Sequence, residues 1–314
     1  MSINRRKFIQ TTTSATTALL LSSLDIFAYT NQPILSMKNH MNTNFELKIL
    51  ATNWGFKGSL DEYCAKVKKE GYDGVELWWP MKKDGQDELF LTLKKYNLEV
   101  GFLCGGSENN WKEHLDSFKN MINAAATNPI HKPLYINCHS GRDFFSYDEN
   151  KAFIDHTTIL SKETGLKICH ETHRARMLFA APVAKQYMER NPELRVTLDA
   201  SHWCNVSESL LDNQQATMDL TLQRVDHIHA RIGHAEGPQV NDPRAPEWAG
   251  AVKSHFAWWD KVVELKKNKG EILTVLTEFG PPDYMPTLPY TGQPLADQWA
   301  INVHMMSLLR KRYQ

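Results

Sequence analysis

The chain has 314 residues, of which 42% are hydrophobic and 23% are charged, as in an ordinary soluble globular protein. Lys and Arg together number 36, and so do Asp and Glu, so the formal net charge is zero. This balance gives no electrostatic reason to expect binding to nucleic acid or to an anionic membrane. The five cysteines include no CxxC pair, which argues against a disulfide framework and against a zinc–thiolate site.

Residues 1–30 have the pattern of an export signal. The pair Arg5 and Arg6 precedes Phe8 and a stretch rich in Thr, Ala and Leu, which resembles a twin-arginine signal. That stretch is too short and too rich in hydroxyl groups for a good spanning helix, so no stable membrane span is expected after export. Passage through the twin-arginine translocase would place the protein in the periplasm or elsewhere outside the cytoplasm. Residues 31–46 are predicted to be a polar linker.

From residue 47 onward, short β-branched runs alternate with longer amphipathic segments. The first helical segment has Ser59 as its N-cap and Gly71 as its stop. Eight βα units over about 270 residues predict a single (β/α)₈ TIM barrel at residues 47–314. The rival fold, a doubly wound sheet, would carry a glycine-rich phosphate loop after its first strand, and this chain has none there. The predicted strands are residues 47–53, 73–79, 98–104, 133–139, 166–171, 194–199, 225–231 and 272–278.

Two irregular segments follow the last two predicted strands. Residues 233–253 contain three prolines and no clear period. In a barrel they would form a loop on the catalytic face, large enough to roof a pocket. Residues 280–294 are expected to form a second loop on the same face.

Four residues with metal-binding side chains lie at or near the ends of the last four predicted strands: Glu171, Asp199, His229 and Glu278. The carboxyl ends of barrel strands meet at one face, so these side chains should share one site. Singly, such a carboxylate would cap a helix or pair with an arginine, but four at matching positions favour a metal. Three carboxylates and one imidazole predict one divalent ion, namely Mn²⁺, Mg²⁺ or Co²⁺, with Zn²⁺ as a further option.

Together with Gly71–Glu76, Asp199–His202 and Thr277–Gly280, these residues resemble the xylose-isomerase-like superfamily of sugar isomerases and epimerases. The resemblance runs from residue 47 to the C-terminus. In the ketose 3-epimerase-like branch such a set holds one divalent ion. The resemblance implies proton transfer by Glu171 and Glu278, and substrate contact by His202. The endonuclease-IV-type branch is disfavoured, because the chain has no basic surplus to grip DNA and export would not serve DNA repair.

Other polar and aromatic side chains are predicted to bind the substrate. His139 ends the fourth predicted strand, and a lone histidine is more often a satisfied hydrogen-bonding group than a ligand. Trp54, like Trp203 and Trp248, could stack on a sugar ring, although a tryptophan is more often part of the core. The full set is His139, His173, Arg174, His202, Arg231, His234, Glu76 and Trp54.

A cation held by a sugar's carbonyl and neighbouring hydroxyl would acidify the C–H between them and stabilise the enediolate. Two carboxylates on opposite faces could then epimerise that carbon, and proton return to the neighbouring carbon would isomerise the sugar. The sequence therefore predicts a metal-dependent isomerase or epimerase of an unphosphorylated sugar or keto-sugar. Two alternatives stay open: a lyase performing β-elimination on 3-keto-glycosides at the same site, and a non-catalytic sugar-binding barrel.

Overall fold

The computed structural model describes residues 44–314 as a closed barrel of eight parallel strands in the order β1 to β8. The predicted export signal, and the predicted linker up to residue 43, lie outside the described residues. In the described part, no helix is long and apolar enough to cross a membrane. The strands are β1 (Glu46–Thr52), β2 (Gly74–Trp78), β3 (Glu99–Gly105), β4 (Ile136–His139), β5 (Ile168–Glu171), β6 (Val196–Leu198), β7 (Val225–His229) and β8 (Ile272–Thr277).

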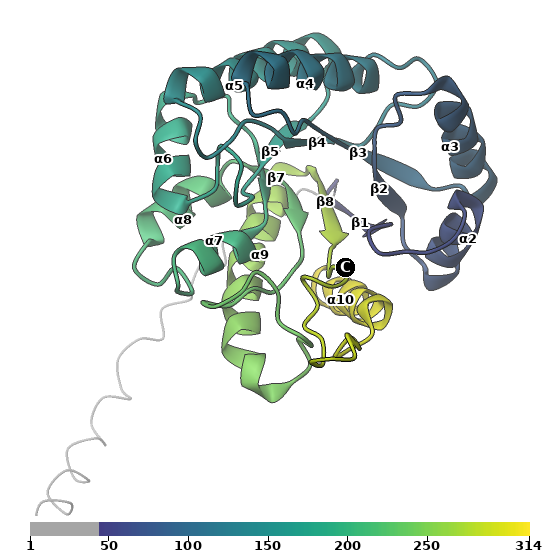
Figure 1. Ribbon diagram of the computed structural model, residues 1–314, viewed down its shortest axis with the longest axis vertical. Helices are drawn as coiled ribbons and strands as arrows, with labels where there is room; N and C mark the ends of the chain where they lie inside the picture. The colour runs from purple at the N-terminus through teal and green to yellow at the C-terminus, as the bar shows by residue number, and fades with distance from the viewer. Residues whose placement is uncertain (1–43) are drawn as a thin grey trace, which may run out of the picture. The chain divides into compact units, whose positions relative to one another are not determined.

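Helices follow the strands and form a ring outside the barrel (Figure 1). This arrangement confirms the predicted single TIM barrel. The helices are α2 (Leu60–Glu70), α3 (Lys83–Tyr96), α4 (Trp111–Ala126), α5 (Tyr147–Thr164), α6 (Ala181–Arg190), α7 (Ala200–Val206), α8 (Gln215–Leu222), α9 (Ala249–Lys269) and α10 (Gln298–Tyr313), with a 3₁₀ turn η1 (Pro246–Trp248).

Local sequence signals set the ends of α2 as predicted. The Ser59 side chain accepts from the backbone N–H of Glu62, and the Glu62 carboxylate accepts from the Ser59 N–H, which forms a capping box. At the other end, Gly71 adopts φ 91°, a left-handed conformation that favours glycine. Because all eight strands are parallel, each βα loop lies at the same end of the barrel.

The predicted long loop at residues 233–253 is wrong at its C-terminal end, because α9 already begins at Ala249. Pro246 starts the 3₁₀ turn that leads into this helix, since its fixed φ suits a first helical position. The small residues that follow carry no apolar period, so the sequence pattern did not predict the first turn of α9.

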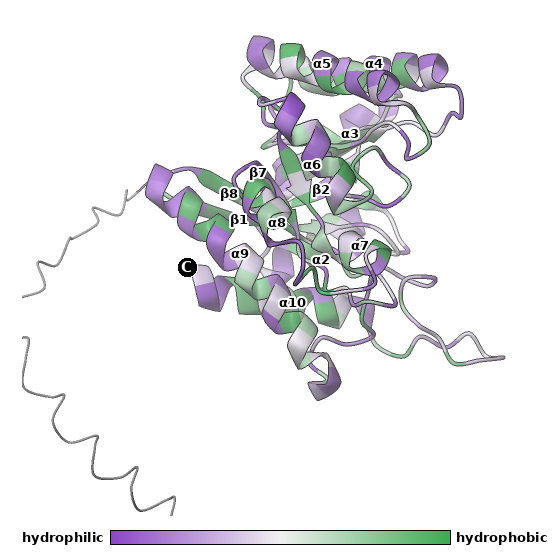
Figure 2. Ribbon diagram, turned by 90° about the vertical axis from the view of Figure 1, so that its left-hand side faces the viewer, coloured by the Kyte–Doolittle hydropathy of each residue, from purple (hydrophilic) through white to green (hydrophobic). Residues whose placement is uncertain are grey.

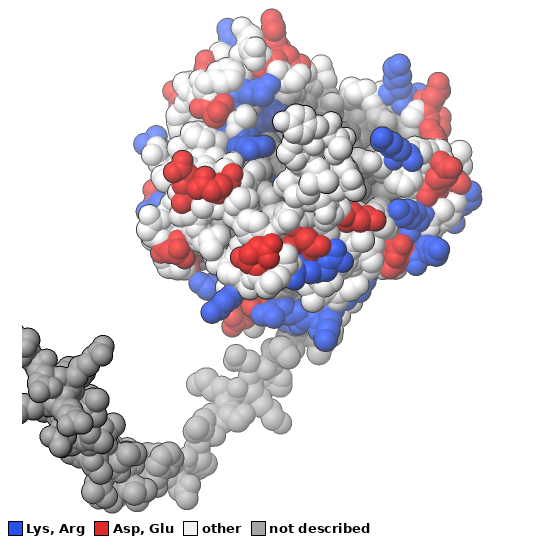
Figure 3. Space-filling model, turned by 60° about the horizontal axis from the view of Figure 1, so that its bottom comes forward, with Lys and Arg blue, Asp and Glu red and all other residues white. Residues whose placement is uncertain are grey.

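Alternate residues of each strand face the helices or the barrel interior. The helix-facing residues belong to one large hydrophobic core, and the helices are more hydrophobic toward the strands than toward solvent (Figure 2). A small separate apolar cluster of Leu50, Tyr135 and Leu276 fills the interior. Acidic and basic side chains are interspersed on the face shown in Figure 3, as the zero net charge predicts.

Candidate metal centre and active site

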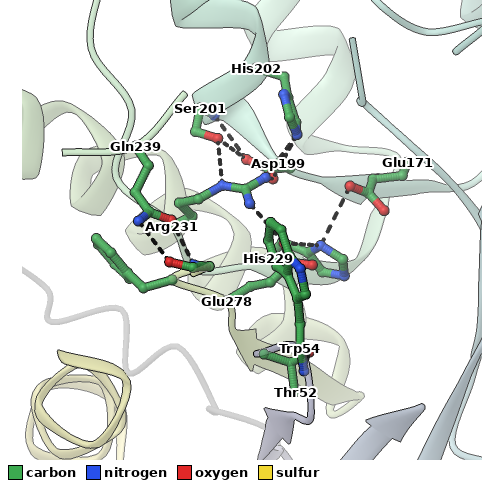
Figure 4. A network of polar contacts seen from close by, with 12 residues as sticks. Thr52, Trp54, Glu171, Asp199, Ser201, His202, His229, Arg231, Gln239 and Glu278 are labelled. Atoms are coloured by element: carbon green, nitrogen blue, oxygen red, sulfur yellow. Dashed lines mark hydrogen bonds and ion pairs between the residues drawn. The ribbon is translucent and has the colours of Figure 1, made fainter. Parts of the chain in front are cut away.

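The structure brings the four predicted metal ligands together. Glu171 and His229 are the last residues of β5 and β7, and Asp199 and Glu278 directly follow β6 and β8. Each offers one ligand atom, and these four atoms all lie within 4.8 Å of one another. Figure 4 shows Glu171 at the end of β5, His229 at the end of β7 and Glu278 after β8 pointing toward one another. The common strand polarity of a parallel barrel produces this convergence.

Three atoms of this cluster are buried and make no hydrogen bond: Glu171 Oε1, His229 Nδ1 and Glu278 Oε2. His229 Nδ1 lies 2.8 Å from Glu278 Oε2 and 3.5 Å from Glu171 Oε1, without hydrogen-bond geometry. Buried polar atoms left unpaired are costly to folding, and each one calls for a physical explanation. A cation between the three atoms would satisfy all of them at once, so the donor set fits a divalent metal.

The charge balance at this end of the barrel points the same way. Four carboxylates, those of Glu76, Glu171, Asp199 and Glu278, lie close together with little or no exposure to solvent. Arg231 is the guanidinium that contacts them, through Asp199 and Glu278. Even with a protonated His229, two positive charges do not neutralise four carboxylates in this environment, and burying uncompensated charge is strongly unfavourable. A divalent cation would reduce this excess.

Burial by itself lowers the pKa of His229. The carboxylates of Glu278, Glu171 and Glu76 outweigh burial and raise that pKa well above its ordinary value. Without a metal, His229 is therefore protonated at neutral pH and supplies the positive charge that the carboxylates need. A metal ligated by Nδ1 would have to displace this proton.

The two carboxylates on the β5 and β6 side differ in basicity. Burial would raise the pKa of Glu171, but His139 and His229 outweigh it and hold the pKa well below the ordinary value. Burial raises the pKa of Asp199 to about 6, against the opposing charge of Arg231 and with the help of neighbouring carboxylates. Glu171 is thus the more strongly ionised member of the pair.

Asp199 is fixed by a network of its own. Its Oδ1 accepts from the backbone N–H of Ser201 at 3.1 Å and from the Ser201 hydroxyl at 2.5 Å. Its Oδ2 contacts Arg231 Nη2 and lies 3.5 Å from His202 Nε2. Arg231 in turn donates to Ser201 Oγ at 3.1 Å and lies over the ring of Tyr284. These contacts hold both the carboxylate and the guanidinium in place beside the cavity.

Glu171 Oε2 has partners that the sequence analysis did not identify in full. Asn137 Nδ2 donates to it at 2.8 Å, and His139 Nε2 lies at the same distance. Asn137 precedes His139 by two residues, so both side chains face the barrel interior. This strand alternation could have identified Asn137 once His139 was considered.

Glu76 lies on the Nε2 side of His229, away from Nδ1, the candidate metal-binding nitrogen. Its Oε1 is 3.5 Å from His229 Nε2, and its Oε2 is 3.4 Å from His227 Nε2. The buried Tyr135 hydroxyl donates to Oε2 at 2.8 Å. A carboxylate behind the second ring nitrogen is a common partner of metal-binding histidines, because it orients the ring and increases its basicity. Glu76 therefore supports His229 besides lining the cavity.

We expect the Glu76→Gln substitution to weaken divalent-metal binding by about 10- to 100-fold, the usual effect of losing such an outer partner. Glutamine keeps an acceptor for Tyr135 but loses the negative charge that faces His229. Competition with a fluorescent chelator measures the affinity, and circular dichroism checks the fold. The matched control is Glu99→Gln at the opposite end of the barrel, which should bind metal like the unmodified protein. Unchanged affinity in Glu76→Gln would show that Glu76 does not support the ligand.

A cavity of about 310 Å³ opens beside the metal ligands. Glu278 reaches it directly, and Tyr284 from the loop after β8 forms part of its wall. No sequence signal identified Tyr284, because it lies in an irregular loop without a period. Five of the predicted substrate-binding residues also line the cavity: Glu76, Trp54, His139, His173 and Arg231.

The other three predicted substrate-binding residues do not line this cavity. His202 is fully buried, with its Nε2 2.8 Å from Arg231 Nη2. Arg174 donates to Asn205 at 3.3 Å and lies over Tyr284. His234 packs against the ring of Trp248, at 4.7 Å between centroids. His202 and Arg174 thus contact Arg231 and Tyr284, which line the cavity, whereas His234 packs elsewhere.

The two tryptophans predicted beside Trp54 are placed differently. Trp203 is fully buried and donates to the carbonyl of Leu178 at 2.8 Å, so it belongs to the core. Trp248 donates to the Asn241 side chain and does not line the cavity. A buried ring whose N–H is satisfied serves packing, the more frequent role of a tryptophan.

The segment 233–253 does not contribute to the cavity lining, contrary to the expected roof. Instead Gln239 braces the loop after β8. Its Oε1 accepts from the Gly280 N–H at 2.7 Å, and its Nε2 donates to the Gly280 carbonyl at 3.2 Å. This segment therefore positions a neighbouring loop rather than covering the site.

No known protein-family model matches the chain. No curated protein sequence matches it either. Solved structures do match. The Escherichia coli 3-keto-D-glucoside 4-epimerase YcjR is 16% identical over 85% of this chain and 100% of its own, with a TM-score of 0.56. The D-allulose 3-epimerase from Methylomonas sp., in complex with D-allulose, is 14% identical over 85% and 97%, with a TM-score of 0.53.

A third match is the IolI protein with a bound zinc atom, 14% identical over 85% of this chain and 99% of its own, with a TM-score of 0.51. The chain shares the barrel fold of these proteins. At such low identities the likeness shows the fold alone, since one fold hosts many chemistries. The case for function therefore rests on the site.

Proposed function

We propose that the protein is a divalent-metal-dependent isomerase or epimerase of an unphosphorylated sugar or keto-sugar. The observation that carries the proposal is the set of buried ligand atoms without hydrogen bonds on Glu171, His229 and Glu278, beside a cavity that Glu278 lines. A divalent ion bound there would supply Lewis-acid polarisation of a carbonyl and its neighbouring hydroxyl. Mn²⁺, Mg²⁺ and Co²⁺ suit these donors, and the zinc atom in IolI keeps Zn²⁺ in consideration.

Glu171 and Glu278 are the groups that would move the proton. They stand at the ends of β5 and β8, and the proposal assigns one carboxylate to each face of the bound sugar. One carboxylate accepts the proton from the carbon next to the carbonyl, and the other delivers a proton to the opposite face, which inverts that carbon. Delivery to the neighbouring carbon would give the isomer instead. Arg231 beside Glu278 would stabilise negative charge that develops on the substrate oxygens.

The lining of the cavity supports an unphosphorylated substrate. Among the described residues that line it, Arg231 is the one lysine or arginine, and Asp199 already engages it. A phosphate group would require further cationic or backbone donors. Two of the matched structures are named as epimerases of such sugars, D-allulose and a 3-keto-D-glucoside, which supports the same substrate class here.

Incubation of the Mn²⁺-loaded protein in D₂O with D-allulose, D-fructose, D-tagatose and methyl 3-keto-β-D-glucoside tests the proposal by NMR and mass spectrometry. We expect deuterium at the carbon next to the carbonyl, together with a new epimer or isomer. Release of methanol from the keto-glucoside would instead identify a lyase. Absence of exchange in every sugar would contradict the proposal and favour a sugar-binding barrel.

We further propose that the twin-arginine pattern at Arg5 and Arg6 exports the protein to the periplasm. That route carries folded proteins, which suits a metal enzyme whose five cysteines are all unpaired and buried. Cell fractionation tests the location. Finding the full-length chain only in the cytoplasm would contradict export.

A further inference from the structure

The cavity beside the metal ligands has two unlike sides. The ends of β4, β5, β7 and β8 contribute its polar side, with His139, His173, Arg231 and Glu278. The ends of β1 to β3 contribute mainly apolar side chains, next to Thr52, Asn53 and Glu76. These apolar side chains are Trp54, Trp78 and Leu103. A molecule that fills the cavity therefore presents a polar part to one side and an apolar part to the other.

Trp54 is held rigidly at this apolar side. Its ring packs edge-on against Tyr284, at 4.9 Å between centroids. It also lies over Gly280, where a Cβ atom would come within 2.3 Å of the indole carbon Cζ3. Its backbone carbonyl accepts from Gln298 Nε2 at 2.7 Å. The residue nevertheless remains 37% exposed, so it is fixed in place without being covered.

Trp78 is the second indole of the apolar side. It is the last residue of β2 and shares the inward face of that strand with Glu76, two residues earlier. Its ring packs edge-on against His139, at 5.6 Å between centroids. Half of the residue, 50%, is exposed. Large aromatic surface that is fixed and exposed at a cavity is typical of a binding site, because a ligand that covers it removes apolar area from water.

We propose that Trp54, Trp78 and Leu103 form a subsite for an aromatic aglycone, so that the natural substrate is a glycoside rather than a free monosaccharide. This inference rests on the proposed function, which places the reacting sugar at Glu171 and Glu278. The aglycone then extends from the sugar toward the ends of β1 to β3, within the same cavity. The sugar would contact the polar side of the cavity, and the aglycone would contact the apolar side.

An aromatic ring suits the subsite better than a second sugar does. Indole rings can stack on either, but a second sugar also brings hydroxyl groups that need hydrogen-bond partners. Leu103, the other apolar side chain that faces this side of the cavity, offers none and is largely buried. An aromatic aglycone has no such requirement and gains from every apolar contact.

Isothermal titration calorimetry of the Mn²⁺-loaded protein tests the subsite by binding alone. The probes are phenyl and methyl β-D-glucoside, phenyl and methyl β-D-galactoside, and cellobiose. In at least one pair we expect the phenyl glycoside to bind about tenfold more tightly than the methyl glycoside, the gain expected from one stacked ring. Cellobiose should bind less tightly than the phenyl glucoside.

The Trp78→Ala substitution should bring the phenyl-to-methyl ratio close to one, whereas Trp78→Phe should keep most of the preference. Leu91→Ala, at a 70% exposed residue of α3, is the matched control and should keep the full ratio. Equal affinities within every pair, absence of binding by all glycosides, or tighter binding of cellobiose would each overturn the subsite. Deuterium exchange into free ketoses without a phenyl preference would overturn this inference alone, whereas absence of exchange would count against the proposed function.

Discussion

Turnover is expected to fall by about 10²- to 10⁴-fold in a Glu278→Gln variant, the usual contribution of a general acid–base group. The Glu278 side chain is 13% exposed and reaches the cavity, so it can meet the substrate directly. Glutamine keeps an oxygen that can ligate a metal but cannot accept a proton. Metal content measured by atomic emission should therefore be largely retained while steady-state turnover is lost.

Comparison with Glu171→Gln sharpens this test. If the two carboxylates serve opposite faces, each variant should still exchange the proton of one epimer with D₂O and fail to exchange that of the other. The two variants should thus show opposite preferences between a pair of epimers. Full turnover in Glu278→Gln with metal bound would remove Glu278 from proton transfer. Identical exchange in both variants would contradict the assignment of one glutamate to each face.

Metal uptake should release about one proton per ion at pH 7. Neighbouring carboxylates raise the pKa of His229 well above its ordinary value, so the metal-free protein binds a proton there. Ligation by Nδ1 requires the neutral ring, so the proton must leave. Below the pKa of His229 in the metal-free protein, metal affinity should then rise about tenfold for each pH unit.

Calorimetry in two buffers of different ionisation enthalpy counts the released protons. The control is His229→Gln, whose side chain cannot be protonated in this range. It should lose this proton release and bind metal more weakly, by more than the roughly 10- to 100-fold expected from loss of an outer partner. The metal affinity should be measured over about one pH unit on each side of neutrality. An affinity that does not change over this range would show that the metal displaces no proton from His229.

The barrel and its four metal-ligand candidates could be predicted because both follow from local patterns. β-branched runs mark the strands, and parallel strands carry every strand end to one face. The predicted positions of Glu171 and His229 coincide with the ends of β5 and β7. The surroundings of Glu171 were harder to predict, since Asn137 has no chemical signature apart from its strand position.

What the sequence did not indicate depends on tertiary contacts. Tyr284 reaches the cavity from an irregular loop, and that loop is held by Gln239, more than 40 residues earlier in the chain. Glu76 was predicted only as a substrate contact, but the structure also places it behind His229. Trp203 and Trp54 were both predicted as tryptophans that could stack on a sugar. Only tertiary packing places Trp203 in the core and Trp54 at the cavity.

Anomalous diffraction from crystals soaked with Mn²⁺ tests the metal site most directly. We predict one strong anomalous peak, about 2.0–2.4 Å from ligand atoms of Glu171, Asp199, His229 and Glu278, within the range of metal–oxygen and metal–nitrogen bonds in proteins. The Asp199→Ala and Glu171→Ala variants, which lose the ligating oxygen, should show a weaker peak at the same place. A map without a peak between these four side chains, or with its strongest peak elsewhere in the barrel, would contradict the metal centre described above.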